Sequence, residues 1–292
     1  MKTIPDLEAQ VLELIRRAST KLPVDVTAAL GAGRAREQAG SAAAATLDTI
    51  LENVDLAAQA STPICQDTGT PVFFVKHPWD FPQRPMIEAV KAAVKTATEK
   101  NYLRPNAVDP VTGANSGNNT GTHFPSFYFE QWDAPGVRFD LLLKGGGSEN
   151  QSAQYSLPHA GLKAGRDMEG VKRVILDAVV NAQGQGCGPA ILGVCIGGDR
   201  ASGYAMAKAQ LLRPLEDASD DPTLAAMEAE ITEKANGLGV GPMGFGGETT
   251  VLATKITKAH RVPASYYVSV NYMCWASRQA GMTYENGEMR HD

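Results

Sequence analysis

The chain has 292 residues, of which 43% are hydrophobic and 20% are charged, a globular profile with ample length for a buried core. Its net charge of −5 argues against nucleic acid binding, which needs a basic face. No run of about 18 apolar residues predicts a membrane span, and the start, Met1-Lys-Thr-Ile-Pro-Asp6, lacks the apolar region of a signal peptide. We therefore expect a cytoplasmic protein.

The first third of the chain carries helical patterns separated by one strand. Apolar residues at helical spacing predict an amphipathic helix over about Ile4–Ser19, and an alanine-rich helix over about Ala35–Ala60. A short apolar strand at Val72–Val75 follows. After a proline-rich loop, a further helix is expected over about Pro85–Asn101, because proline is tolerated in a first helical turn.

The remainder of the chain mixes strands and helices without a regular repeat. Phe127–Trp132 and Val137–Leu143 flank a Pro-Gly corner, which is a hairpin pattern. Further elements are a helix over about 168–183, a strand around Cys195, helices beginning near 202 and 225, and strands over 249–256 and 266–272. This mixture favours an α+β fold. We treat residues 1–278 as one catalytic domain and expect a loose polar tail at 279–292.

The turn Cys65-Gln-Asp-Thr-Gly-Thr70 is the first candidate site. It lies between a predicted helix and a predicted strand, and it concentrates a thiol, an amide, a carboxylate and two hydroxyls. Loops held by rigid elements often carry function. Taken alone, a cysteine beside an aspartate is more often structural than catalytic.

A long polar loop and a glycine run are further candidates. The stretch Val111–Thr122 has no hydrophobic period, and loops of this length are usually functional or disordered. Arg104, near its start, could bind an anion or simply be solvated. The run Lys144–Asn150 contains three glycines, whose backbone can approach a ligand closely, but it matches no phosphate-binding fingerprint.

The four cysteines are Cys65, Cys187, Cys195 and Cys274, and disulfides are not expected in a large protein without a signal peptide. Three of them occupy turns or strand ends, whereas Cys195 lies inside an apolar strand and is read as a core residue. Three thiolates could hold a [4Fe–4S] cluster with one iron left open as a Lewis acid. Spacing alone leaves unrelated core thiols equally open.

Five segments together resemble the α part of class I fumarases, the iron–sulfur hydro-lyases that include L-tartrate dehydratase. They cover nearly the whole chain, in order: Cys65-Gln-Asp-Thr-Gly-Thr70, Gly145-Gly-Gly-Ser-Glu-Asn150, Cys187-Gly-Pro-Ala-Ile-Leu-Gly-Val194, Gly244-Phe-Gly-Gly-Glu-Thr-Thr250 and Met273-Cys-Trp-Ala276. The resemblance implies a [4Fe–4S] cluster in which one iron is not bound by protein.

The resemblance also implies a role for individual residues. Cys65, Cys187 and Cys274 would bind the cluster, and Cys195 would not. Asp67 would be catalytic. Substrate would be bound by four residues, namely Gln66, Arg104, Gly146 and His260.

In the family that the chain resembles, a β-type domain or subunit completes the active site. This implies a partner subunit, an α2β2 heterotetramer and a small dicarboxylate substrate. Fumarate hydration to L-malate is the first expectation, and L-tartrate dehydratase or mesaconate hydratase is the alternative. Two non-enzyme alternatives stay open: an iron–sulfur scaffold or sensor, and a plain metabolite-binding protein with unrelated thiols.

Overall fold

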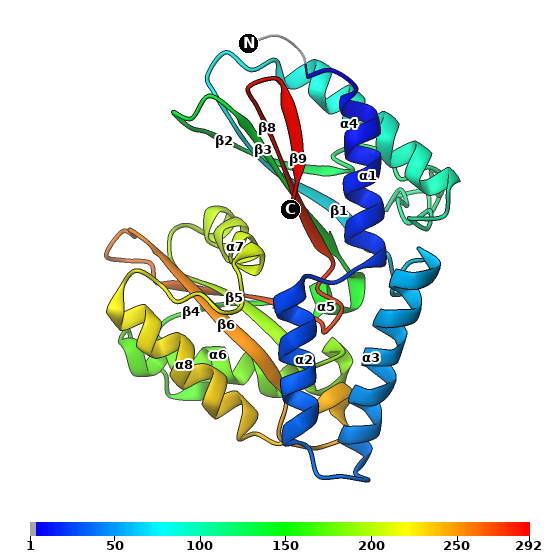
Figure 1. The fold of residues 1–292 in the computed structure, drawn as a ribbon. Coiled ribbons are helices and arrows are strands. Elements are labelled where there is room, and N and C mark those ends of the chain that lie inside the picture. Colours follow the sequence, from blue (N-terminus) through cyan, green and yellow to red (C-terminus); the bar gives the residue numbers. More distant parts are fainter. Residues whose placement is uncertain (1–3) are drawn as a thin grey trace. The chain divides into compact units, whose positions relative to one another are not determined.

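The computed structural model describes residues 4–292 (Figure 1). The chain folds into two compact units. The first unit contains the residues up to 23 together with 53–146 and 276–292, and the second contains 24–52 and 147–275. The helices and mixed sheets of both units confirm the α+β class. Among the described residues, no helix is long and apolar enough to cross a membrane.

The first unit is built on a five-stranded sheet with the order β2-β1-β3-β8-β9. Its strands are β1 (Thr70–His77), β2 (Ser126–Gln131), β3 (Val137–Lys144), β8 (Gln279–Glu285) and β9 (Glu288–His291). β1 and β2 are parallel, and the other neighbours are antiparallel. Helices α1 (Leu7–Thr20) and α4 (Gln83–Glu99) lie side by side and share one core with the sheet (Figure 1).

Sequence periodicity explains this core. Val11, Leu14 and Ile15 recur at helical spacing on α1 and are fully buried. Along β3, Phe139 and Leu141 alternate toward the same core, as period-two patterning requires.

The second unit is built on a four-stranded sheet with the order β4-β7-β5-β6. Its strands are β4 (Ala153–Ser156), β5 (Ala190–Gly197), β6 (Val251–Ala259) and β7 (Tyr267–Met273). β5 and β6 are parallel, and β7 runs antiparallel to β4 and β5. Helices α6 (Met168–Ala182) and α8 (Pro222–Asn236) share a core with one face, and α7 (Arg200–Ala209) packs on β5 and β7.

The remaining elements are helical. α2 (Val24–Arg36) contacts β6 in the second unit, α3 (Ala42–Ala60) begins in the second unit and ends in the first, and α5 (Gly146–Asn150) is a single short turn of helix. Four 3₁₀ segments are also present: η1 (Ala160–Leu162), η2 (Gln183–Gly186), η3 (Gln210–Leu212) and η4 (Pro242–Gly244).

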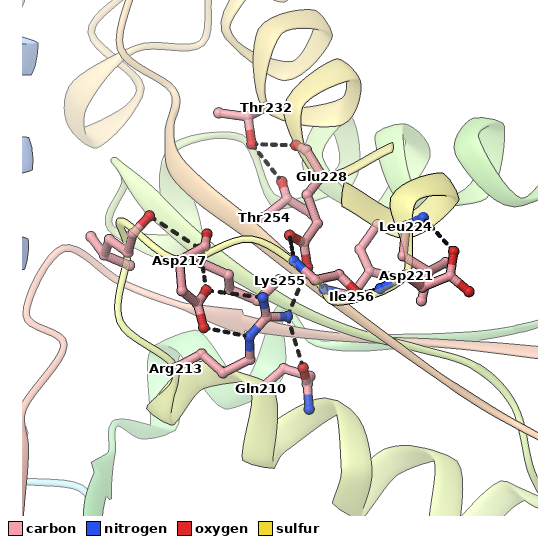
Figure 2. Close-up of polar contacts among 12 residues, drawn as sticks. Gln210, Arg213, Asp217, Asp221, Leu224, Glu228, Thr232, Thr254, Lys255 and Ile256 are labelled. Atoms are coloured by element: carbon pink, nitrogen blue, oxygen red, sulfur yellow. Dashed lines mark hydrogen bonds and ion pairs between the residues drawn. The ribbon is translucent and has the colours of Figure 1, made fainter. Parts of the chain in front are cut away.

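A network of charged side chains connects the 213–222 loop to β6 and α8 (Figure 2). Arg213 donates to Glu228 Oε1 at 2.7 Å and to Asp217 Oδ1 at 2.9 Å. Lys255 Nζ donates to Asp217 Oδ1 at 2.8 Å, and Glu228 Oε1 accepts the Ile256 N–H at 2.6 Å. The buried charges are therefore paired and hydrogen-bonded, as burial of a charge requires.

Two sequence expectations are wrong. β2 and β3 do not form a hairpin, because β1 lies between them and pairs with both: Phe73 is opposite Phe127 on one side and Leu141 on the other. The residues expected as a loose tail form β8 and β9 instead. Their polar sequence hides a buried Met282, which packs into the core of the first unit. Helices α2 and α5 and strand β4 were also not predicted.

Candidate active site

The turn from Cys65 to Gly69 connects α3 to β1 in the first unit. Cys65 and Asp67 are half-buried, Gln66 is exposed and Thr68 is fully buried. Asp67 Oδ1 accepts the Gly69 N–H at 3.1 Å, which closes the turn. Gly69 has φ +77°, and a Cβ there would lie 2.6 Å from the Lys144 carbonyl carbon. The turn therefore needs glycine at this position.

The polar loop after α4 is attached to this turn. The Arg104 N–H donates to Thr68 Oγ1 at 3.0 Å, and Asn106 Nδ2 donates to the same oxygen at 3.1 Å. The Arg104 guanidinium is exposed and donates through Nη1 to Gln66 O at 3.2 Å. The structure thus places Arg104 beside Gln66, although 38 residues separate them in sequence.

The glycine run after β3 reaches the same turn. A Cβ built on Gly145 would lie 3.1 Å from Asp67 Oδ2, and one on Gly146 would lie 3.8 Å from it. Gly145 is buried, whereas Gly146 is exposed at the start of α5. Arg278, the residue just before β8 on the other side of β3, donates to the Asp67 carbonyl oxygen. Gln66, Asp67, Arg104 and Gly146 therefore meet in the first unit.

Two of the predicted cysteines lie together in the second unit. Cys187 follows η2 with φ +53°, and its carbonyl oxygen accepts the Trp275 N–H at 3.1 Å, which brings Cys274 to the same end of β5. Burial, together with the nearby Cys274 and Cys187, raises the pKa of the Tyr272 hydroxyl. Both thiols are thus at the β5 end where α6 and η2 arrive.

Cys195 and His260 lie elsewhere. Cys195 is fully buried inside β5, and burial raises the pKa of its thiol to about 11. His260 is exposed just after β6, which is parallel to β5 and ends where β5 ends. Cys187 precedes the start of β5, so the length of that strand, roughly 25 Å, separates the two. The structure does not bring His260 to the two thiols of this unit.

Fit to an iron–sulfur cluster can be judged from the donor set. Cys187 and Cys274 offer two neighbouring soft sulfur ligands in the second unit, and half-buried Cys65 offers a third in the first. Thiolates of this kind suit such a cluster. No group of three or more His, Cys, Asp or Glu side chains arranged to hold a metal ion is found within residues 4–292.

Two residues of the first-unit site were missed by sequence reasoning. Thr68 is the buried acceptor that anchors the Arg104 loop, and Arg278 is the buried donor to Asp67. Thr68 lies inside the motif and could have been proposed from it. Arg278 stands just outside the last motif, at the boundary of the expected tail, and burial of a lone arginine has no sequence signal.

Comparison with known proteins identifies a family that this chain matches. The model of the family described as "Fumarate hydratase (Fumerase)" matches residues 8–283. "Putative fumarate hydratase class I" of Geobacillus stearothermophilus is 49% identical over 94% of this chain and 54% of its own length. "Putative L(+)-tartrate dehydratase subunit alpha" of Methanocaldococcus jannaschii is 37% identical over 92% of this chain and 94% of its own.

A third relative, "L(+)-tartrate dehydratase subunit alpha" of Escherichia coli, is 30% identical over 92% of this chain and 89% of its own. The chain therefore spans about half the length of the Geobacillus relative, but nearly all of the two relatives that carry a subunit name.

Proposed function

Because the chain belongs to the fumarate hydratase family, we propose that it is the α-type part of a [4Fe–4S]-dependent hydro-lyase that interconverts fumarate and L-malate. The observation that carries the proposal is the meeting of Gln66, Asp67 and Arg104 on the Cys65 turn, inside the matched region. In the hydration direction, water contributes a hydroxyl to one alkene carbon and a proton to the other.

The proposed cluster ligands are Cys65, Cys187 and Cys274. When bound, a cluster with one iron not held by protein supplies a Lewis acid for the substrate hydroxyl and carboxylate. Cys195 is not proposed as a ligand, because it is fully buried inside β5 and its raised pKa keeps the thiol protonated.

Arg104 is proposed to pair with a substrate carboxylate. An arginine presents five N–H donors in a planar fork that matches a carboxylate. One of these donors contacts Gln66 O, and the guanidinium remains exposed to solvent. The Gln66 amide and the backbone N–H of Gly146 are proposed to orient the remaining substrate oxygens. His260 stays a prediction, and its place at the far end of β6 offers it no support.

Asp67 is proposed to hold or move the proton that leaves or joins the substrate carbon. Its Oδ1 is occupied by the Gly69 N–H, and its Oδ2 faces the glycine run. The carboxylate is therefore oriented by the backbone while one oxygen points toward the proposed substrate contacts. A threonine of the partner subunit is the proposed second member of this proton pathway.

A β-type partner subunit is proposed to complete the site, in a cytoplasmic α2β2 heterotetramer. Two relatives that match nearly full length carry the name "subunit alpha", which supports a division of the enzyme between chains. A dicarboxylate carries two negative charges. Arg104 would pair with one carboxylate, and a cationic group of the partner would pair with the other.

L-Tartrate dehydratase is the second candidate, because the same two relatives carry that name. Mesaconate hydratase is a further variant. These substrates differ by a hydroxyl or a methyl group, and a methyl-sized difference in an apolar pocket is worth only about 1–3 kcal/mol. An iron–sulfur scaffold or sensor is the non-enzyme candidate.

The test is anaerobic co-expression with a β-type subunit, followed by iron and sulfide counting and assays with fumarate, L-tartrate and mesaconate. About four irons per pair of chains and malate formation that is lost in air are expected. Turnover of tartrate alone would support the proposed cluster and would make L-tartrate, not fumarate, the substrate. A loaded but inactive complex would favour the scaffold, and an iron-free protein would contradict the proposal.

A further inference from the structure

Gly145 is the point where a carboxylate and a guanidinium meet in the first unit. A Cβ built on this residue would lie 3.1 Å from Asp67 Oδ2 and 3.3 Å from Arg278 Nη2. Both atoms therefore face the same small space beside the glycine backbone. Even one methyl group there would press on its neighbours, because real Cβ contacts are rarely this close. At Gly147, two residues on, a Cβ would meet nothing within 4 Å.

Arg278 is bound into this position from several directions. Its side chain is almost completely buried, and its Nη1 donates to the carbonyl oxygen of Asp67. Its Nε donates to Ala276 O at 3.4 Å, and its own carbonyl accepts the Leu143 N–H at 2.9 Å. The backbone of Arg278 is thus held to β3, while its guanidinium is directed at the Asp67 turn. Burial of a cation is costly unless its donors are hydrogen-bonded. The carbonyl oxygens of Asp67 and Ala276 supply acceptors for the buried guanidinium.

We propose that Arg278 is a positioning residue that sets the orientation of the Asp67 carboxylate, with Gly145 as the gap that admits both side chains; this rests on the proposed hydro-lyase function. Arg278 is too deeply buried to touch substrate, so it acts through Asp67. One edge of the guanidinium holds the Asp67 backbone while another faces the space that the carboxylate shares. Lysine has a single ammonium without this planar fork and cannot do both.

The first experiment compares variants of the anaerobically purified complex with its partner subunit. Arg278→Lys is expected to lower kcat about a hundredfold while KM changes little, since a misplaced catalytic group costs about that much. Gly145→Ala should lower the same parameter by a smaller factor, and Gly147→Ala should leave it unchanged. Arg138→Gln is the matched arginine control: Arg138 lies on β3 and pairs with Asp140 and Asp292, so its loss should lower Tm and not kcat.

The second experiment measures the stability of the Asp67 turn and does not depend on enzyme activity. Hydrogen exchange of a peptide covering residues 64–70 should be at least severalfold faster in Arg278→Lys than in the wild type, and unchanged in Arg138→Gln. If the wild-type complex hydrates no dicarboxylate, the proposed function is wrong. Hydrogen exchange of residues 64–70 would still show whether Arg278 holds the Asp67 turn. Unchanged exchange in Arg278→Lys, or an unchanged kcat in an active complex, would overturn the positioning role.

Discussion

Asp67 is constrained on three sides, by one group of its own turn and by two groups that are distant in sequence. The Gly69 N–H holds its Oδ1, Arg278 holds its carbonyl oxygen, and Gly145 leaves room for its Oδ2. A carboxylate used only for packing would not need such control of direction. A group that transfers a proton must lie within hydrogen-bond reach of that proton, so the constraint fits the proposed chemistry.

Asp67→Asn should therefore separate chemistry from assembly. The amide keeps the size of the side chain and can still accept the Gly69 N–H, but it cannot take up a proton. We expect the iron content and Tm of the wild type, with turnover lower by about 10²–10⁴-fold. Iron counting and steady-state kinetics of the co-expressed complex measure both. Wild-type turnover in this variant would show that Asp67 takes no part in the reaction.

Glu13 on α1 gives a prediction of pH dependence. Its hydrogen bond with Arg16, aided by Arg17 and opposed by partial burial, lowers its pKa from 4.5 to about 2. A carboxylate with a lowered pKa in the folded state stabilises the fold above pH 4.5, and that contribution is lost as the pH falls toward 2. Glu13→Gln should lower Tm slightly at neutral pH, because exposed pairs contribute about 0.2–1 kcal/mol, and should match the wild type near pH 2.

The control for this effect is Glu8→Gln, an exposed position on the same helix. It should leave Tm unchanged across the same pH range. A Glu13→Gln deficit that persists undiminished at pH 2 would mean that the side chain stabilises α1 by packing and not by charge.

At the level of residues, the sequence offers candidates where a motif marks the turn, and it offers none where only burial marks a residue. Cys65, Gln66 and Asp67 are adjacent in one turn, so their proximity was never in question. Arg104 was proposed through a resemblance; the structure places it in contact with Gln66 O, and its role in binding substrate stays a prediction. Arg278 was missed, because its burial depends on strand β8, a segment that reads as polar.

At the scale of elements, the Gly247–Thr250 segment is explained by the end of α2. Glu37 is buried, and its carboxylate accepts the Glu248 N–H at 3.1 Å and the Thr249 N–H at 2.8 Å. A Cβ on Gly247 would lie 2.6 Å from the same carboxylate. This glycine-dense motif is therefore accounted for by structure alone, as the docking point of α2 against β6.

Removing this anchor should destabilise the second unit. Glu37→Ala leaves the N–H groups of Glu248 and buried Thr249 without their acceptor, and hydrogen bonds to a charged group contribute about 1.5–3 kcal/mol. The urea midpoint of Glu37→Ala should be lower than that of the wild type by an amount that matches this free energy. Gln38 is exposed at the next position, and Gln38→Ala should leave the midpoint unchanged. A Glu37→Ala midpoint equal to that of the wild type would mean that water replaces the carboxylate without cost.

The ion network of Figure 2 connects the 213–222 loop to β6. Burial pushes the pKa of Asp217 upward, but its contacts with Arg213 and Lys255 outweigh this and lower it. Lys255→Met removes a buried ammonium that donates to Leu215 O, Asp217 O and Asp217 Oδ1, while Asp217 keeps its pairing with Arg213. Because hydrogen bonds to charged groups contribute about 1.5–3 kcal/mol, the urea midpoint should fall by a corresponding amount. Lys258→Met is the matched control, since Lys258 lies three residues along β6 with an exposed side chain. Equal urea midpoints for the two variants would contradict a stabilising role for the network.

Element prediction was reliable where apolar spacing was regular and failed where pairing depends on distant segments. α1, α4, α6 and β5 follow their patterns closely. α2 was missed because its buried positions, Val26, Leu30 and Gly33, are few and one is a glycine. The false hairpin has a different cause: adjacency in sequence favours direct pairing, but the more apolar β1 takes the central place between β2 and β3.

At the scale of the whole molecule, the proposed cluster ligands belong to different units. Cys65 lies in the first unit, and Cys187 and Cys274 lie in the second. Cys65 lies 122 residues before Cys187, and Cys187 lies 87 residues before Cys274, so sequence alone does not indicate which thiols fold together. A cluster that binds only the folded protein stabilises it, because binding energy adds to folding energy.

This linkage predicts how cysteine replacements affect the chain. Cys65→Ser and Cys187→Ser should each remove most of the iron and lower Tm to the value of the iron-free wild type, although one alters the first unit and the other alters the second. Cys195→Ala should keep the iron, with at most a modest packing loss, because this thiol is a small buried side chain in β5. Anaerobic iron counting with thermal unfolding tests all three together. Full iron retention in Cys65→Ser would confine the cluster to ligands of the second unit and remove the Cys65 turn from the proposed metal site.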